Sequence, residues 1–325
     1  MRAPALLAVL CAAVMAASRA DAQAVAQASW PVKPVRVVVA FAPGGIADVA
    51  ARLVASRLSV SLGQPFVVEN RAGGGGNLGA VAVARAAPDG YTVLATTTSV
   101  AVNPSLSRNA GYELERDLLP VVNLASSPNL IVVHPGTGAR NLKQLIEKAR
   151  GAKLNYGSAG AGTTPHLSAE YLFRILAKVD VTHVPYKGAG PAIAAALGGE
   201  VEIASIAMPP AIVHVKAGRL IGIAVTSRQR VPSLPEVPTV DESGFPGFED
   251  YTWVGLFLPR GAPPEAVARL NAETRRLLAT EDMKSRLAAL GFEPAGGSPA
   301  EFSRYVAAEV RKWARVVRDT GARAD

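Results

Sequence analysis

Cysteine is almost absent from this chain of 325 residues, and the one cysteine, Cys11, lies in an apolar N-terminal segment. Residues 1–24 have the features of a secretory signal, because Arg2 supplies a positive charge, an apolar run follows and the alanines at 20, 22 and 24 offer two alternative A-x-A cleavage sites. Cys11 would leave with that segment, so we expect a mature chain without disulfides, catalytic thiols or cysteine metal sites. We therefore expect an exported, periplasmic protein that folds by packing alone.

Long apolar runs, clustered charge and metal-binding spacings are also missing. After residue 24 no apolar run approaches the roughly 18 residues that a membrane helix needs. The formal charge is +8, but the basic residues are scattered and are not interleaved with aromatic residues, which argues against nucleic-acid binding and leaves a mild attraction for anions. No metal site is expected, because the histidines are far apart and show no H-E-x-x-H spacing: His134, His166, His183 and His214.

Two motifs resemble known sites without completing them. Gly74, Gly76 and Gly79 match the spacing of a dinucleotide-binding loop, but the following strand does not end in the acidic residue that would hold a ribose. Ser158 resembles the serine of a nucleophile elbow, but Tyr156 stands where that motif has its first glycine. We therefore expect neither a nucleotide or other cofactor nor an acyl-enzyme.

What the chain does contain is a regular alternation of short β-rich runs and helical patterns. The first such series has expected strands at 35–41, 65–70 and 91–98 and expected helices at 46–58 and 77–87. A second series begins near Asn129 and includes an expected helix from about 166 to 176. The C-terminal part has an expected strand at 253–259, a helix at about 263–279, and a last helix opened by a capping box of Ser298 and Glu301. This order is typical of βαβ units with a mainly parallel sheet.

The two series predict two α/β domains joined by a two-strand hinge around a ligand cleft. We expect domain I to combine residues 25–126 with 250–325, and domain II to hold residues 127–249. The two crossings between the domains are expected near 124–128 and 248–253.

Three expected strand-to-helix corners are rich in glycine, at 41–48, 156–166 and 185–192. A loop without side chains lets a ligand reach backbone N–H groups, and the helix that follows offers unpaired donors with a partial positive charge. Each corner is therefore a candidate seat for a carboxylate or phosphate, although glycine also serves simple turn geometry. His166 could contact an anion or cap its helix, Asp48 could serve a ligand or complement its helix dipole, and Lys187 could be a ligand cation or a surface lysine.

The corners and their surroundings resemble the Bug family, the extracytoplasmic substrate-binding receptors of tripartite tricarboxylate transporters. The resemblance covers essentially the whole mature chain. It implies a type II periplasmic-binding-protein fold that closes on a small carboxylate, held largely by backbone and water-bridged hydrogen bonds, and a monomer that delivers this ligand to membrane permease subunits. The matching blocks are "FAPGGIADVAARLVASRL", "QPFVVENRAGGGGNLGAVAVARAAPDGYTVL", "NYGSAGAGTTPHLSAEYL", "HVPYKGAGPAI" and "VPTVDESGFPGFEDYTWVGLFLPRGAP".

The resemblance also implies a set of ligand-binding residues from both domains: Pro43, Gly44, Gly45, Asp48, Thr97, Thr98, Ser158, Gly160, Gly162, Thr163, His166, Tyr186, Lys187 and Gly188. One block departs from the family, because Ser205, Ile206 and Ala207 stand where many members have a Phe-Asp-Asn-like segment whose acid faces the cleft. Ile206 cannot accept a hydrogen bond from an ammonium group, so we expect Ile206 in the site to favour acids without an amine over amino acids.

Two other functions stay open from the sequence. One is a periplasmic α/β hydrolase acting on a carboxylate or ester, and the other is a ligand-presenting partner of a sensor kinase. The hydrolase requires a nucleophile, a base and an orienting group together, and the sequence offers no complete set. A receptor without catalysis is therefore the function that the sequence favours.

Overall fold

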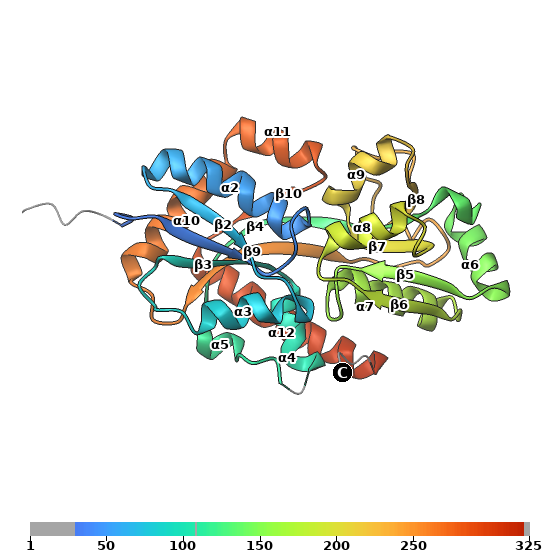
Figure 1. The fold of residues 1–325 in the computed structure, drawn as a ribbon, viewed down its shortest axis with the longest axis horizontal. Helices are drawn as coiled ribbons and strands as arrows, with labels where there is room; N and C mark the ends of the chain where they lie inside the picture. The colour runs from blue at the N-terminus through green and yellow to red at the C-terminus, as the bar shows by residue number, and fades with distance from the viewer. Residues whose placement is uncertain (1–29, 108, 322–325) are drawn as a thin grey trace, which may run out of the picture.

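A computed structural model describes residues 30–107 and 109–321, so the expected signal segment, residues 1–24, lies outside the described residues. The described strands form one continuous sheet in the order β2-β1-β3-β9-β4-β7-β5-β6, with β8 and β10 also paired to β4. Figure 1 shows two halves side by side along the long axis of the molecule, with β4 passing through both. The long strand β4, Leu118–Val133, therefore belongs to both halves.

The first half contains a parallel group of strands, β2 (Phe66–Asn70), β1 (Val35–Val39) and β3 (Thr92–Thr97), followed by antiparallel β9 (Tyr251–Pro259) and β10 (Glu293–Gly296). Strand β1 consists of four buried valines and the half-buried Arg36, and such a nearly continuous apolar run is typical of a strand covered by helices on both sides. The helices of this half are α2 (Ile46–Leu62), η1 (Gly74–Gly76), α3 (Asn77–Ala84), α4 (Ser99–Leu106), α5 (Leu114–Asp117), α10 (Pro264–Leu278), α11 (Glu281–Ala289) and α12 (Pro299–Thr320).

The second half places parallel strands β7 (Ile203–Ala207), β5 (Leu154–Ser158) and β6 (Val181–Pro185) beside β4, while β8 (Ile221–Val225) pairs antiparallel with β4. Two apolar clusters pack here, one including Ile203 and the other Ile206. The helices are η2 (Pro135–Thr137), α6 (Leu142–Gly151), α7 (Thr164–Glu170), η3 (Tyr171–Leu176), α8 (Ala189–Leu197) and α9 (Met208–Lys216). We propose that the two halves are the two domains expected from the sequence.

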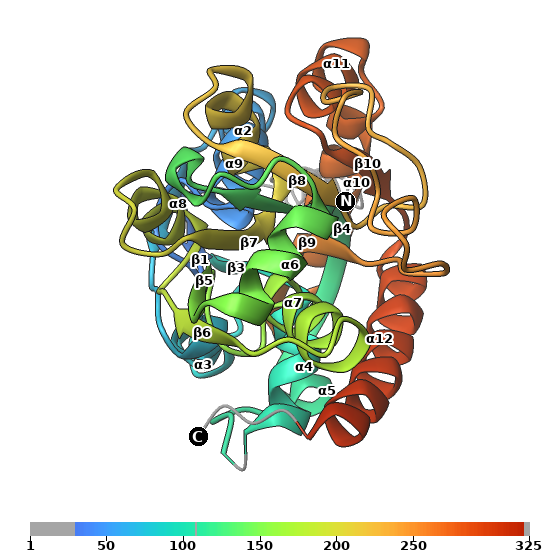
Figure 2. The same cartoon turned by 90° about the vertical axis from the view of Figure 1, so that its right-hand side faces the viewer.

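Buried hydrogen bonds tie the two segments that cross between the halves. The side-chain amide of Asn129 on β4 donates to Asp250 at 2.7 Å, and the hydroxyl of Thr252 donates to the amide oxygen of Asn129 at 2.7 Å. Helix α12 adds an apolar contact between the halves, since Trp313 packs in one cluster with Leu106 of α4 and Leu167 of α7. Figure 2 shows α12 running beside α4 and α7.

Some elements differ from the sequence expectations. One helix is expected from about 166 to 176, but α7 ends at Glu170 and continues as a π-helical segment, η3. Helices α4, α5 and α11 are not predicted by the sequence analysis; α4 contains Pro104 and α5 is a single turn. The predicted capping box at the start of α12 is confirmed, because Ser298 and Glu301 make both of its reciprocal hydrogen bonds.

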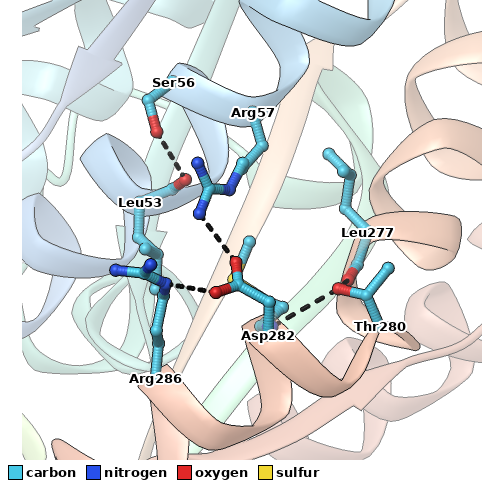
Figure 3. Close-up of polar contacts among 8 residues, drawn as sticks. Leu53, Ser56, Arg57, Leu277, Thr280, Asp282 and Arg286 are labelled. Carbon is cyan, nitrogen blue, oxygen red and sulfur yellow. Dashed lines mark hydrogen bonds and ion pairs between the residues drawn. The ribbon is translucent and has the colours of Figure 1, made fainter.

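Helix α11 is fixed to α2 by a surface ion-pair cluster, drawn in Figure 3. Asp282 accepts from Arg57 of α2 at 2.7 Å and from Arg286 of its own helix at 2.7 Å. Thr280 caps α11 by accepting from the backbone N–H of Met283. Within residues 30–107 and 109–321, no helix is both long and apolar enough to span a membrane.

Candidate functional site

A cavity of about 20 Å³ lies where the two halves of the molecule meet, which is room for about one water molecule. Its walls are contributed by both halves, and among the described residues that line it none is charged. Three threonines supply hydroxyl groups and the rest are apolar or glycine. The lining residues are Phe41, Gly45, Ile46, Ala47, Thr97, Ala159, Thr163, Pro165, Ala189, Ala207 and Thr252.

In the described part of the chain, four helices begin at or directly after residues that line this cavity, and a fifth begins close to it. Helix α2 starts after Gly45, α7 after Thr163 and α9 after Ala207, and these three residues line the cavity. Helix α8 begins at Ala189, and Thr97 lies two residues before α4. The first N–H groups of a helix have no partner within it, and the helix dipole adds a partial positive charge there. The first turns of α7, α8 and α9 contain proline, which has no N–H, so these helices offer fewer donors than α2. The helix starts therefore place partial positive charge around the cavity, although no described lining residue is a formal cation, and this arrangement suits an anion bound by backbone groups.

The first glycine corner is held in shape by Asp48. The Asp48 carboxylate accepts from the backbone N–H of Gly44 at 2.9 Å, from Arg52 at 2.9 Å and from Asn70 at 2.8 Å. Burial alone would raise the pKa of Asp48, but the hydrogen bonds from Arg52, Gly44 and Asn70 hold it below its usual value. Asp48 thus faces its own loop, and of the four predicted residues in this corner Gly45 lines the cavity while Pro43 and Gly44 are exposed.

The two predicted threonines at the end of β3 have different surroundings. Thr97 lines the cavity, and its hydroxyl lies 3.1 Å from that of Ser99. Thr98 is fully buried and accepts from the backbone N–H of Trp253 at 3.1 Å. Thr98 therefore fixes β9 to the start of α4, next to the site.

Most of the predicted residues in the second glycine corner form hydrogen bonds within their own loop. The Thr163 side chain lines the cavity and donates to the carbonyl of Gly160 at 2.7 Å. The His166 ring accepts from the N–H of Gly162 at 3.3 Å, and the N–H of Gly160 donates to Ser158 at 3.2 Å. Ser158 and His166 therefore shape the loop that positions Thr163.

His183, on β6, is not a predicted site residue, but its half-buried ring contacts both His166 and Ser158 of this loop. Its ring stacks on that of His166 with centroids 4.0 Å apart, and its Nε2 lies 2.7 Å from the Ser158 hydroxyl. Burial lowers the pKa of His166 to about 4, and burial together with the neighbouring His166 lowers that of His183 to about 3. Both rings are therefore neutral at pH 7, and each can accept a hydrogen bond.

The Ser158–His183 pair has the geometry of a serine with its general base. However, Ser158 is completely buried, and its hydroxyl also bonds within its own loop to Gly160. The cavity is lined by Ala159 and Thr163 of the same loop, and Ser158 is not among its lining residues. The pair therefore holds the loop in place rather than presenting a nucleophile to the cavity.

The third predicted corner contacts the first corner through its main chain. The carbonyl of Lys187 accepts from the N–H of Ala42 at 3.0 Å, while the Lys187 side chain is exposed. The N–H of Tyr186 donates to the carbonyl of Ser158 at 3.1 Å, and Gly188 precedes the first turn of α8. Lys187 therefore joins the two halves by its backbone.

Ile206 lies elsewhere than the sequence analysis expects. Its side chain is fully buried in the apolar cluster that includes Leu130, Ala192 and Ile212. Successive residues of a strand point to opposite faces, and it is the next residue, Ala207, that lines the cavity. This placement does not support Ile206 as a ligand contact.

Several lining residues were not predicted: Phe41, Ile46, Ala47, Ala159, Pro165, Ala189, Ala207 and Thr252. Ile46, Ala47 and Ala189 stand in the first turns of α2 and α8, directly after glycine, so the position of the helix start is the signal that finds them. Ala207 stands before the Pro209-Pro210 pair that opens α9, and proline is common in a first helical turn.

Comparison with known proteins places this chain in a family. Residues 50–322 match the sequence model of the TctC family, the tripartite tricarboxylate transporter family receptors. The chain is 36% identical to protein BugT of Bordetella pertussis over 322 residues, which covers 98% of each chain.

Solved structures give the same result. The structure of Rpa4515 of R. palustris with adipate has a TM-score of 0.87 and 38% identity, covering 90% of this chain and 98% of that one. MatC from Rhodopseudomonas palustris with bound malate has a TM-score of 0.82 and 35% identity, covering 89% of this chain and all of that one. The expected α/β periplasmic-binding-protein fold is confirmed by these likenesses. The chain belongs to the receptor family of the tripartite tricarboxylate transporters, as its sequence blocks predict.

Proposed function

We propose that this receptor binds a small dicarboxylate between its two halves and delivers it to the permease subunits of a tripartite tricarboxylate transporter. The observation that carries the proposal is the convergence of four helix N-termini, those of α2, α7, α8 and α9, on one cavity whose described lining has no charged side chain. Such a site holds a carboxylate by backbone N–H groups and leaves the ligand body against small apolar residues. The adipate and malate of the two similar structures are ligands of this chemical class.

The room at the site limits how a dicarboxylate can enter. A cavity of about 20 Å³ holds no more than about one water molecule, so the two halves must separate to admit a larger ligand. We propose that they open at the two crossing segments, and that the protein acts as a periplasmic monomer after its N-terminal signal is removed.

We also propose that the protein releases its ligand unchanged. A hydrolase would need the Ser158 hydroxyl to reach a substrate, and that hydroxyl is buried and bonded within its own loop. A ligand-presenting partner of a sensor kinase would use the same site, and deletion of the cognate permease separates the two roles: loss of uptake supports transport.

The binding proposal is tested by a thermal-shift screen with matched ligands. Succinate, malate and adipate are compared with their diamides, which have similar size and no charge. Ligand at a hundredfold excess over Kd stabilises the folded protein by about 2.7 kcal/mol. We expect shifts with acids only, and recovery of unaltered acid after incubation. Equal shifts with the diamides would overturn the proposal that the site binds carboxylates. Hydrolysis of an ester probe would overturn the proposal that the protein releases its ligand unchanged.

A further inference from the structure

The first and third glycine corners touch each other directly across the junction of the two halves. The N–H of Ala42 donates to the carbonyl of Lys187, and Gly45 lies against Ala189. Beside these contacts, Gly190 lies in the first turn of α8, opposite the carbonyl of Pro43. The two halves are therefore in main-chain contact at the edge of the cavity.

Gly190 has no reason within its own helix to be glycine. Its backbone is helical and not left-handed, and alanine is favoured over glycine in such a conformation. A Cβ at Gly190, however, would lie 2.5 Å from the carbonyl oxygen of Pro43 in the other half. Only the contact between the halves therefore requires glycine at this position.

The Pro43 carbonyl cannot easily move aside. It belongs to the same peptide group as the N–H of Gly44, and that N–H is held by the buried carboxylate of Asp48. Asp48 in turn is fixed by Arg52 and Asn70. Rotating the peptide to make room for a Cβ would break the hydrogen bond to Asp48, so the halves would have to separate instead.

Other glycines at the junction give a less clear test. A Cβ at Gly188 would lie 2.9 Å from the N–H nitrogen of Ala42, and one at Gly75 would lie 2.0 Å from the carbonyl oxygen of Ala161. Both glycines have a positive φ, at 155° and 58°, that side-chain-bearing residues rarely adopt. Substitution there would disturb the loop itself, whereas Gly190 isolates the contact between the halves.

We infer that Gly190 is a positioning residue for closure: its missing side chain sets how closely the two halves can approach, through the Pro43 carbonyl that Asp48 holds in place. The inference rests on the proposed function in one respect, namely that the approached state is the one that retains a dicarboxylate. Gly190 thereby controls ligand affinity without touching the ligand.

The experiment measures the distance between the halves in Gly190→Ala. Spin labels are attached at cysteines introduced at Val60 on α2 and Glu147 on α6, both exposed, in the mature chain, since the sequence after residue 24 has no native cysteine. Distances are measured by pulsed electron resonance without ligand and with excess succinate, malate or adipate. We expect the shortest distance populated by the parent protein to be absent from Gly190→Ala, and the Kd of the tightest of these acids to rise at least tenfold.

Gly151→Ala is the matched control, because Gly151 is also helical and a Cβ there meets nothing within 4 Å. It should keep the parent distances, and both variants should unfold at or above the parent midpoint.

The double variant Gly190→Ala with Asp48→Ala, which frees the Pro43 peptide, should regain part of the short-distance population. Identical distances in Gly190→Ala and the parent would overturn the inference. A parent protein that binds none of the acids would overturn the proposed function, while the distance comparison would still test Gly190.

Discussion

At the scale of single residues, Gly45 and Lys187 distinguish a backbone site from a salt bridge. A Cβ at Gly45 would meet only ordinary contacts, 3.6 Å from the nitrogen of Ala189, but the methyl groups of a valine would extend into the cavity that Gly45 lines. Lys187 contributes its carbonyl, which an alanine keeps. We expect Gly45→Val to weaken dicarboxylate binding at least about tenfold, or about 1.4 kcal/mol, and Lys187→Ala to weaken it less. Calorimetric titration of both variants measures the difference.

Gly45→Ala is the control for this comparison, because its single methyl group fits the observed contacts. It should bind nearly as well as the parent protein. A larger loss in Lys187→Ala than in Gly45→Val would instead identify the lysine ammonium as the anchor of the ligand.

The same residues show what sequence could and could not predict about the site. Glycine after a strand predicts a close backbone approach, and Gly45 and Thr163 do line the cavity. The direction of a side chain is harder to predict, because Asp48 faces its own loop and Ile206 faces the core. Small apolar residues such as Ala47 form part of the cavity wall, and no side-chain chemistry marks them in a sequence.

At the scale of elements, α7 and β6 are joined by the stacked rings of His166 and His183. Burial first, and for His183 also the neighbouring ring, lowers the pKa values to about 4 and about 3. Between pH 6.5 and about 4 the unfolded chain therefore binds more protons than the folded one, so stability falls as the pH falls through this range. One such proton changes the free energy of unfolding by at most about 1.4 kcal/mol per pH unit.

We expect His183→Gln to reduce this fall in stability. The variant removes one titrating ring, while the glutamine amide can still bond to the Ser158 hydroxyl. Urea denaturation at several pH values between 7 and 4 measures the slope for both proteins. A variant with the same slope as the parent would show that the buried pair does not govern acid stability.

Helices and strands could be predicted where a local sequence signal marks them, and they could not be predicted where tertiary contacts determine whether the element forms. The capping box of Ser298 and Glu301 predicts the start of α12 from sequence alone. Helix α4 contains Pro104 and β-branched residues, and its burial against α12 compensates for its poor helix propensity. The π-helical continuation of α7 at Tyr171–Leu176 leaves no periodicity that separates it from an ordinary helix.

At the scale of the whole molecule, Asp250 lies where the return segment crosses between the halves. Its carboxylate accepts from Asn129 of β4 and from Ser168 of α7, and its carbonyl accepts from Thr226. Burial raises the pKa of Asp250 to about 7, although the hydrogen bond from Ser168 and the charge of Lys312 act against that rise. The crossing therefore binds a proton in the folded state at a pH where the unfolded chain has released it.

This raised pKa opposes the effect of the histidine pair. From about pH 4 to 7 the folded chain holds the Asp250 proton and the unfolded chain does not, so this group alone makes the free energy of unfolding fall as the pH rises. Above pH 7 both states have released the proton, and the group adds no further pH dependence. The histidines make stability rise with pH over nearly the same range.

We expect Asp250→Asn, which keeps an acceptor for Asn129 and stays neutral, to steepen the rise in unfolding free energy between pH 4 and 7. Urea denaturation compares it with Asp180→Asn, an exposed control before β6 that should keep the parent profile. Parallel profiles for Asp250→Asn and the parent would show that the crossing carries no titrating carboxyl.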